Sequence, residues 1–341
     1  MTRPNEQTRL FRALIAKLDP EIRRAIMMAW DEIRAGIDWG ALRDALSRQD
    51  TPAAIAALNI EPAAFELYRQ AVTAAYSQGG MLAATTVNGP PGSTVTFRFD
   101  MSNPRAEAWI ALNVGQRITR LAEEAIEASR SAILAGYQAG RHPNSIALDL
   151  GGRMVGGRRQ GGVLGLSGPQ TEYVLAMRAR LESGDAAELR KVLEMSRRDR
   201  RYDRLIHRAI AGERLAKADI DKLVQRYSDQ LLALRAETIA RTETGQAVMS
   251  ARKEEWRQAC EKLGYPLDAV TKAWRHGGGV REPRWWHIQA NGMQVQGLEV
   301  AFILANGARM QHALDPAGGA SECANCSCDT TFRLDHSWGL T

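Results

Sequence analysis

The sequence predicts an α+β protein with mostly α-helical, elongated N-terminal and middle regions and a small C-terminal mixed α/β module. Three observations favour this fold class. Apolar residues recur at steps of three and four through the N-terminal and middle segments. Only 6% of the 341 residues are aromatic, which suits a helical protein better than a sandwich or barrel. After residue 265, glycines and turn residues replace the helical periodicity.

The first of four expected regions is helical and covers residues 1–90. Apolar residues from Phe11 to Ile26 keep the helical spacing. The stretch "DTPAAIAALNI" starts a further helix, with Asp50 or Thr51 as its N-cap and Pro52 in the first turn.

The second region, residues 91–165, combines a strand, a helix and an arm. "TVTFRFD" (94–100) alternates as a short strand does, and a helix should run from Pro104 to about Gly140. Residues 150–168 then hold eight glycines and three arginines, including Arg158 and Arg159. This segment is too rich in glycine for regular structure. We expect either an extended arm that orders on a partner or a flexible linker.

The third region, residues 166–265, is helical, and its last helix should end before Gly264 and Pro266. It contains a basic segment, residues 190–208, with eight Lys or Arg and three acidic residues. Its arginines at steps of four, three and four should line one helix face and could contact phosphates or an acidic protein surface. The candidate contacts to DNA or protein are Arg190, Lys191, Arg197, Arg198, Arg201, Arg204 and Arg208, together with Arg158 and Arg159.

The fourth region, residues 266–341, is the α/β module, and a polar helix should be clamped to it. In "LRAETIARTETGQA", Glu237 and Arg241 have the spacing of a surface ion pair, whereas Glu243 leans toward the packed face. A buried carboxylate needs a partner, and arginines and His287 follow nearby. The expected structural polar brace consists of Glu237, Arg241, Glu243, Arg281, Arg284 and His287, and Arg275 is a further possible partner of Glu243. The alternative interpretation makes Glu243 a general base next to His287.

A cysteine cluster lies near the C-terminus. "SECANCSC" places Cys323, Cys326 and Cys328 at C-x-x-C-x-C spacing, which suits a structural zinc ion with His287 as a further ligand. His312, His336 and Cys260 are other residues that could complete the site. The alternative is that the cysteines are reduced thiols packed as small apolar side chains.

The remaining sequence features favour a binding protein over an enzyme. We find no G-x-x-x-x-G-K-[ST], G-x-S-x-G or H-E-x-x-H motif, so no catalytic residue and no other cofactor are expected. The net charge of +6 favours an anionic partner. The sequence has no apolar stretch of membrane-spanning length and no signal peptide, which predicts a protein of the cytosol or of a particle assembled there.

Several of these segments together resemble the phage Mu F-type head morphogenesis family of minor capsid proteins. "RYSDQLLALRAETIARTET" is similar to the family's introducing helix, and "KAWRHGGGVREPRWWHIQANG" carries Trp274, Arg281, Arg284, His287 and Gly292 in matching places. "ALDPAGGASECANCSC" resembles the closing D-P…E-x-x-N-C-R-C motif, with Ser327 in place of the arginine. Upstream, "FRFDMSNPRAEAWI" and "GGRRQGGVLGLSGPQ" also resemble members of this group, so the resemblance covers about residues 95 to 335.

This resemblance implies a minor capsid protein of a tailed bacteriophage. It would be made in the host cytoplasm, associate with the portal protein and with scaffold or major capsid protein, and enter the virion. Several copies would lie inside the capsid at the portal vertex and contact packaged double-stranded DNA, with no membrane partner. The alternative function is a metal-dependent nuclease or hydrolase that acts during head maturation, built on His287, Glu243 and the cysteines. A free nucleic-acid-binding protein is a third interpretation.

Overall fold

The computed structural model describes residues 5–278 and 282–338, and it confirms the α+β, mostly helical fold class. The chain divides into two compact units. Unit 1 comprises Met1–Ala25, Tyr68–Gln116 and Glu237–Thr341, and unit 2 comprises Ile26–Leu67 and Arg117–Ala236. These units differ from the four consecutive regions expected from the sequence, because the boundaries fall inside long helices instead of in the breaker clusters between them.

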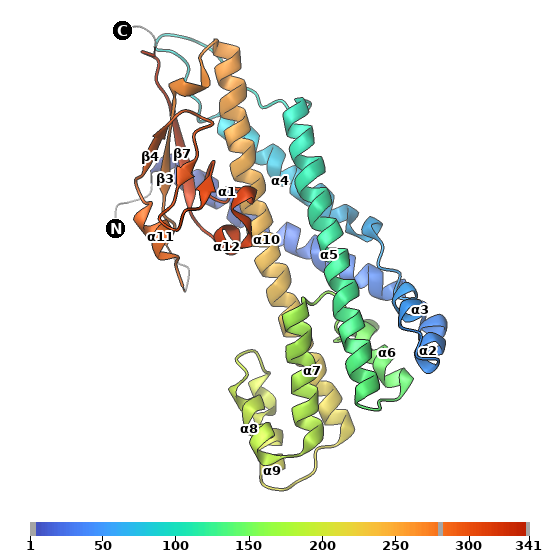
Figure 1. The fold of residues 1–341 in the computed structure, drawn as a ribbon. Coiled ribbons are helices and arrows are strands. Elements are labelled where there is room, and N and C mark those ends of the chain that lie inside the picture. The colour runs from blue at the N-terminus through green and yellow to red at the C-terminus, as the bar shows by residue number, and fades with distance from the viewer. Residues whose placement is uncertain (1–4, 279–281, 339–341) are drawn as a thin grey trace. The chain divides into compact units, whose positions relative to one another are not determined.

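Helices make up most of both units (Figure 1). The α-helices are α1 (Glu6–Ala35), α2 (Trp39–Ser47), α3 (Thr51–Ala56), α4 (Glu66–Ala84), α5 (Pro104–Gln138), α6 (Pro143–Gly151), α7 (Gly168–Ser183), α8 (Ala186–Glu194), α9 (Asp203–Ile210), α10 (Lys217–Leu263), α11 (Trp285–Gln289) and α12 (Gly319–Cys323). Short 3-10 helices are η1 (Pro62–Phe65), η2 (Arg200–Tyr202), η3 (Leu267–Ala269) and η4 (Pro316–Gly318). Within the described residues, none of the helices combines the length and the apolar character needed to cross a bilayer.

The strands form small antiparallel sheets. They are β1 (Arg153–Val155), β2 (Arg158–Gln160), β3 (Val270–Arg275), β4 (Gln294–Gln296), β5 (Phe302–Ile303), β6 (Arg309–Met310) and β7 (Asp329–Leu334). In unit 1, β3 is the central strand between β4 and β7, and its pairing with β7 runs from Val270 opposite Leu334 to Arg275 opposite Asp329. Figure 1 shows this sheet beside the C-terminal part of α10, which is the mixed α/β module expected from the sequence.

The long helices begin and end where the sequence predicts. α5 starts at Pro104 and ends just before Gly140, which has a φ of +62°. α10 ends before Gly264, whose φ of +70° is the left-handed conformation that glycine adopts at helix ends. The Asp50 side chain caps α3 by accepting a hydrogen bond from the Ala53 N–H at 3.0 Å. Local capping chemistry therefore sets these boundaries.

The strand predicted at residues 94–100 is wrong. This segment is irregular in the structure and pairs with no strand of the described chain. Its alternating aromatic residues pack on helices instead: Phe97 joins the core of unit 1, and the Phe99 ring lies against Tyr76 and Gly80 of α4. A Cβ at Gly80 would lie 2.1 Å from that ring, so the close contact needs glycine.

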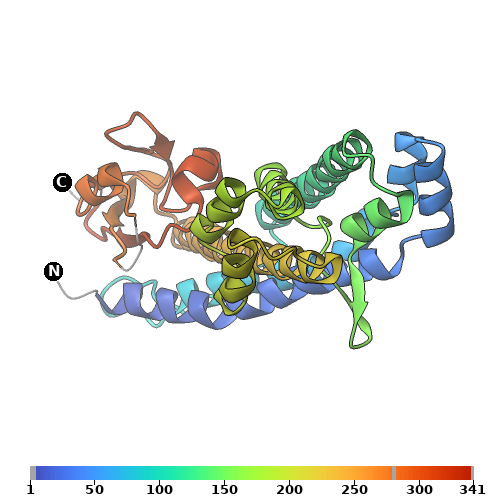
Figure 2. The same ribbon diagram turned by 90° about the horizontal axis from the view of Figure 1, so that it is seen from below.

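The Gly/Arg-rich segment is ordered in unit 2, so neither the extended arm nor the flexible linker describes it. β1 and β2 form a hairpin whose turn is Gly156–Gly157, with φ of +57° and +80°. Such a pair of left-handed residues is the usual two-residue hairpin turn. Beyond it Val163, Leu164 and Leu166 are buried, which ties the segment to the helices of its unit. Figure 2 shows the green hairpin projecting from those helices.

A buried ion network stabilises unit 2. The Asp149 carboxylate at the end of α6 pairs with Arg141, Arg153 and Arg178, at 2.8 to 3.3 Å. Arg178 and Arg153 also reach Asp221 of α10, at 2.8 and 2.9 Å. These contacts join α6 and α7 to the N-terminal part of α10.

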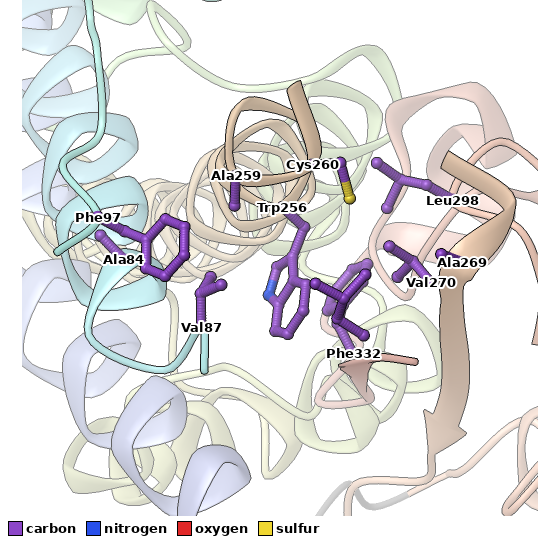
Figure 3. Packing of buried hydrophobic residues seen from close by; sticks show 11 residues of the cluster. Ala84, Val87, Phe97, Trp256, Ala259, Cys260, Ala269, Val270, Leu298 and Phe332 are labelled. Carbon is purple, nitrogen blue, oxygen red and sulfur yellow. The ribbon is translucent and has the colours of Figure 1, made fainter. Parts of the chain in front are cut away.

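The hydrophobic core of unit 1 fixes the C-terminal sheet on α10 (Figure 3). The Trp256 indole of α10 stacks on Phe332 of β7 with ring centroids 5.8 Å apart, and Val270 of β3 packs beside them. Other members of this cluster are Ala84, Val87, Phe97, Ala259, Cys260, Ala269, Leu298 and Leu334.

The buried carboxyl of Glu255, on α10, makes stability depend on pH. Glu255 is 1% exposed, and its Oε2 has no hydrogen-bond partner among the described residues. Burial, assisted by the charge of Glu254, raises the pKa of Glu255 from 4.5 to about 8. Between these values the folded protein keeps a proton that the unfolded chain releases, so stability falls as pH rises through this window.

Glu255→Gln should therefore stabilise the protein. We expect the free energy of unfolding at pH 8 to rise by about 2–3 kcal/mol, with a weaker loss of stability between pH 4.5 and 8. Urea unfolding at several pH values measures both effects. Glu107→Gln, at an exposed position of α5, is the control. An unchanged pH slope in the Glu255 variant would show that this carboxyl is ionised in the fold.

Candidate functional site

The segments that carry the family resemblance meet in unit 1. The Thr242 hydroxyl of α10 accepts a hydrogen bond from the Asn325 N–H at 3.3 Å. One turn further along α10, Gly245 lies against Leu314, and a Cβ at Gly245 would be 2.6 Å from the leucine side chain. The motif helix and the closing motif are therefore packed directly together.

His287 is the centre of the site. It lies on α11, is 2% exposed, and its ring contacts the edge of Trp274 with centroids 5.2 Å apart. Its Nε2 is 2.8 Å from Glu322 Oε2, and its Nδ1 is 3.5 Å from Cys326 Sγ and 3.6 Å from Cys328 Sγ. An ionised carboxylate only accepts, so Nε2 carries the proton that it donates to Glu322. Nδ1 then faces the two sulfurs.

Glu322 is the carboxylate that orients His287. This residue of α12 is 3% exposed and also accepts hydrogen bonds from Trp286 Nε1 at 2.8 Å and from Asn306 Nδ2 at 2.9 Å. Burial alone would raise the pKa of Glu322, but these donors together hold it below its usual value. The carboxylate is therefore ionised and fully hydrogen-bonded in a buried position.

The two cysteines next to His287 differ in their acidity. Both are buried, and the Cys328 N–H donates to Cys326 Sγ at 3.4 Å. A hydrogen bond from the Cys328 thiol lowers the pKa of Cys326 to about 5, against the effect of burial and with help from His287. The same hydrogen bond raises the pKa of Cys328, and burial adds to the effect. A thiolate beside an imidazole can bind a soft metal ion or act as a nucleophile.

Three of the four predicted ligands lie together in the structure. The ligand atoms of His287, Cys326 and Cys328 all lie within 4.8 Å of one another, and Cys323 is not part of this group. The Cys323 thiol instead donates to the Asp315 carbonyl at 3.0 Å, and burial raises its pKa to about 12. Cys260, another candidate, belongs to the hydrophobic core.

The sequence offered His287 as one of several possible partners of Glu243. Both ring nitrogens of His287 face other groups, Glu322 on one side and the two cysteines on the other, so His287 is not the partner of Glu243. Arg284 donates to the carbonyls of Ser321 and Ala324. The physical reason is the position of α12, which places Glu322 directly beside α11.

The other brace residues have different positions. Glu237 and Arg241 form the predicted i,i+4 ion pair at 3.0 Å on an exposed face of α10. Glu243 is buried, with 4% of its surface exposed, as its position in the helix predicts. Arg281 lies outside the described residues.

The prediction that the arginines of residues 190–208 share one helix face is wrong, because this segment does not form a single helix. α8 ends at Glu194, η2 follows at Arg200–Tyr202, and α9 begins at Asp203. The Asp199 side chain caps η2 by accepting the Arg201 N–H, so it starts a new element inside the expected helix. Of the four arginines at helical spacing, only Arg204 and Arg208 share a helix.

Several candidate contact residues are neutralised locally. Arg198 forms a bidentate pair with Asp203, and Arg201 one with Asp199. The other pairs are Lys191 with Glu188 and Arg208 with Glu213. Four exposed arginines of the basic segment form no ion pair with the described part of the chain. They are Arg190, Arg197, Arg200 and Arg204. Arg200 was not among the candidates from the sequence.

The two hairpin arginines also have separate roles. The Arg159 guanidinium lies 3.6 Å over the Trp39 ring and donates to the Gly152 carbonyl, so it holds the hairpin. Arg158 is exposed and lies 3.9 Å from Asp31. Of the two, only Arg158 is exposed.

Comparisons with protein-family models, with curated proteins and with solved structures find no match for this chain. The function is therefore inferred from its residues and their geometry.

Proposed function

We propose that the protein is a minor capsid protein of the phage Mu F-type head morphogenesis family, bound to the portal inside the head and contacting packaged DNA. One observation carries the proposal: the three segments that resemble the family pack against one another in unit 1. Thr242 meets Asn325, Gly245 meets Leu314, and His287 meets Glu322. Residues up to 83 positions apart that form one buried cluster are expected if the motifs specify a common module.

The burial of the polar residues supports attachment as the mode of action. A metal-dependent hydrolase built on His287 and Glu243 needs both groups open to substrate, and they are 2% and 4% exposed. Two pockets formed by described residues of unit 1 are lined by other residues, among them Arg275, Arg333 and His336 for one and Arg105, Lys253 and His312 for the other. The cluster is therefore better suited to hold the module together than to turn over a substrate.

The exposed arginines of unit 2 are the proposed DNA-contacting groups. Arg190, Arg197, Arg200 and Arg204 have no ion pair in the described chain, so binding a phosphate would not require breaking one. Their neighbours Arg198 and Arg201 already have carboxylate partners. The net charge of +6 is consistent with an anionic partner.

Replacing Arg197, Arg200 and Arg204 by Gln should weaken DNA binding and its dependence on salt. Each lost phosphate contact reduces the slope of log K against log salt by about 0.9, so the slope should fall by up to about 3. Fluorescence anisotropy with duplex DNA at several salt concentrations measures it. Gln variants of Arg309 and Arg333, exposed in unit 1, are the control. An equal change in both variants would exclude these arginines as a specific contact surface.

Portal attachment is tested by co-assembly. The chain is produced together with the portal, scaffold and major capsid proteins of the same phage, and proheads are purified. We expect it in proheads that contain portal and not in shells assembled without portal. Equal amounts in both kinds of shell, or absence from both, would contradict the proposal.

A further inference from the structure

The spacing of the donor atoms around His287 Nδ1 matches a tetrahedral metal ion. Zinc binds cysteine sulfur at about 2.3 Å and histidine nitrogen at about 2.0–2.1 Å, so these ligand atoms lie about 3.5–3.6 Å apart in a tetrahedron. The observed separations from Nδ1 are 3.5 Å to Cys326 Sγ and 3.6 Å to Cys328 Sγ. All three donors lie within 4.8 Å of one another and are buried.

The groups behind these donors also have the arrangement of a metal site. Metal-binding histidines commonly donate their other ring N–H to a carboxylate, which fixes the ring and directs the free nitrogen to the ion. Glu322 holds His287 in this way at 2.8 Å, and Trp286 and Asn306 in turn hold Glu322. Gly277 packs so closely on Ser327, between the two cysteines, that a Cβ there would lie 1.9 Å from the Ser327 carbonyl oxygen.

We propose that His287, Cys326 and Cys328 bind one zinc ion, with Glu322 as the positioning residue for His287. The assignment differs from the C-x-x-C chelate that the sequence suggests, because it uses the C-x-C pair and excludes Cys323. A fourth ligand completes the tetrahedron. Among the described residues, no further His, Cys, Asp or Glu belongs to this group, so a water molecule is the candidate for the fourth ligand.

The ion would join two segments that the chain separates by about forty residues. His287 lies on α11, whereas Cys326 and Cys328 lie in the turn between α12 and β7. Zinc binding adds its free energy to that of folding when the ligands are brought together only in the folded state. The proposed ion is therefore structural, and this inference is independent of the proposed function: a protein without metal could still be a head component.

The test uses the full-length reduced protein and Co²⁺ or Zn²⁺ as the probe. After removal of any metal with a chelator, Co²⁺ should bind at one equivalent with the visible and sulfur-to-cobalt absorption bands of a tetrahedral thiolate site. Zinc should displace it and raise the thermal unfolding temperature. Protein purified without chelator should contain close to one zinc by mass spectrometry of the metal.

Variants assign the ligands. Cys326→Ser, Cys328→Ser and His287→Ala should lose the cobalt bands, and Glu322→Gln should bind zinc about 10–100-fold more weakly. Cys323→Ser and Cys260→Ser are matched controls at buried cysteines outside the group and should keep one equivalent. Circular dichroism checks that each variant is folded.

Two results would overturn the proposal. One is reduced, folded wild-type protein that binds neither Co²⁺ nor Zn²⁺. The other is a Cys323→Ser variant that is folded and loses the ion, since the sequence-based chelate would then be the correct one.

Discussion

Asp329→Ala should lower the free energy of unfolding by about 3–5 kcal/mol, the usual cost of leaving a buried charge without its partner. The Asp329 carboxylate, at the start of β7, accepts from Arg252 Nη1 at 2.8 Å and from the Thr8 hydroxyl at 2.6 Å. Arg252 is fully buried on α10, lies 3.9 Å over the Phe11 ring and also donates to Gln7. Its guanidinium has no route to water in the fold.

Chemical denaturation of the purified protein measures this loss. Glu237→Ala removes an exposed partner from the Glu237–Arg241 pair and should cost only about 0.3–0.5 kcal/mol. The double variant Arg252→Met/Asp329→Leu removes both buried charges and should recover most of the stability. A loss below 1 kcal/mol for Asp329→Ala would mean that Arg252 reaches solvent.

Trp274→Ala should cost about 3–5 kcal/mol, because it empties a large volume at the centre of the module. The Trp274 indole is buried on β3 and forms T-shaped contacts with the rings of His287 and Phe302, with centroids 5.2 and 5.5 Å away. Its removal leaves a cavity beside the histidine, so we also expect weaker metal binding by the His287 cluster.

Trp285→Ala is the matched control. Trp285 is 59% exposed on α11, and its loss should change the free energy of unfolding by less than about 1 kcal/mol. Denaturation followed by circular dichroism avoids dependence on tryptophan fluorescence. Equal losses in the two variants would contradict the packing described for the module.

Helix boundaries could be predicted because they depend on local chemistry. Pro104 at the start of α5, Gly264 after α10 and the Asp50 cap of α3 act through backbone groups within a few residues. The hairpin turn at Gly156–Gly157 could have been predicted in the same way, because two consecutive glycines are a common two-residue hairpin turn. The segment was instead interpreted from its overall glycine content.

The break in the basic segment had a local signal too. Asp199 and Asp203 stand at the starts of η2 and α9, and each also pairs with an arginine of the segment. An argument from the spacing of charged residues alone ignores aspartates that start a new helix. It therefore overestimated the number of arginines that share a face.

The partners inside the candidate site could not be predicted in the same way, because they come from distant segments. Glu322 and His287 are 35 residues apart, and only the packing of α12 on α11 brings them together. Glu322 does stand at the acidic position of the closing motif, so pairing the motif's carboxylate with the motif's histidine would have found it. The sequence placed Glu243 correctly in a buried position and offered an arginine or His287 as its partner, but His287 already has another partner in Glu322.

The central proposal is that this chain attaches to the portal, and its location in an assembled phage head is the most direct test. A cryo-electron microscopy map of the portal vertex, from particles of the phage that encodes the chain, should contain density for α10 and the β4–β3–β7 sheet in contact with portal subunits. The account also predicts that His287 and Glu322 remain buried in that density. A complete map of the vertex without this chain, in particles whose protein composition also lacks it, would contradict the account.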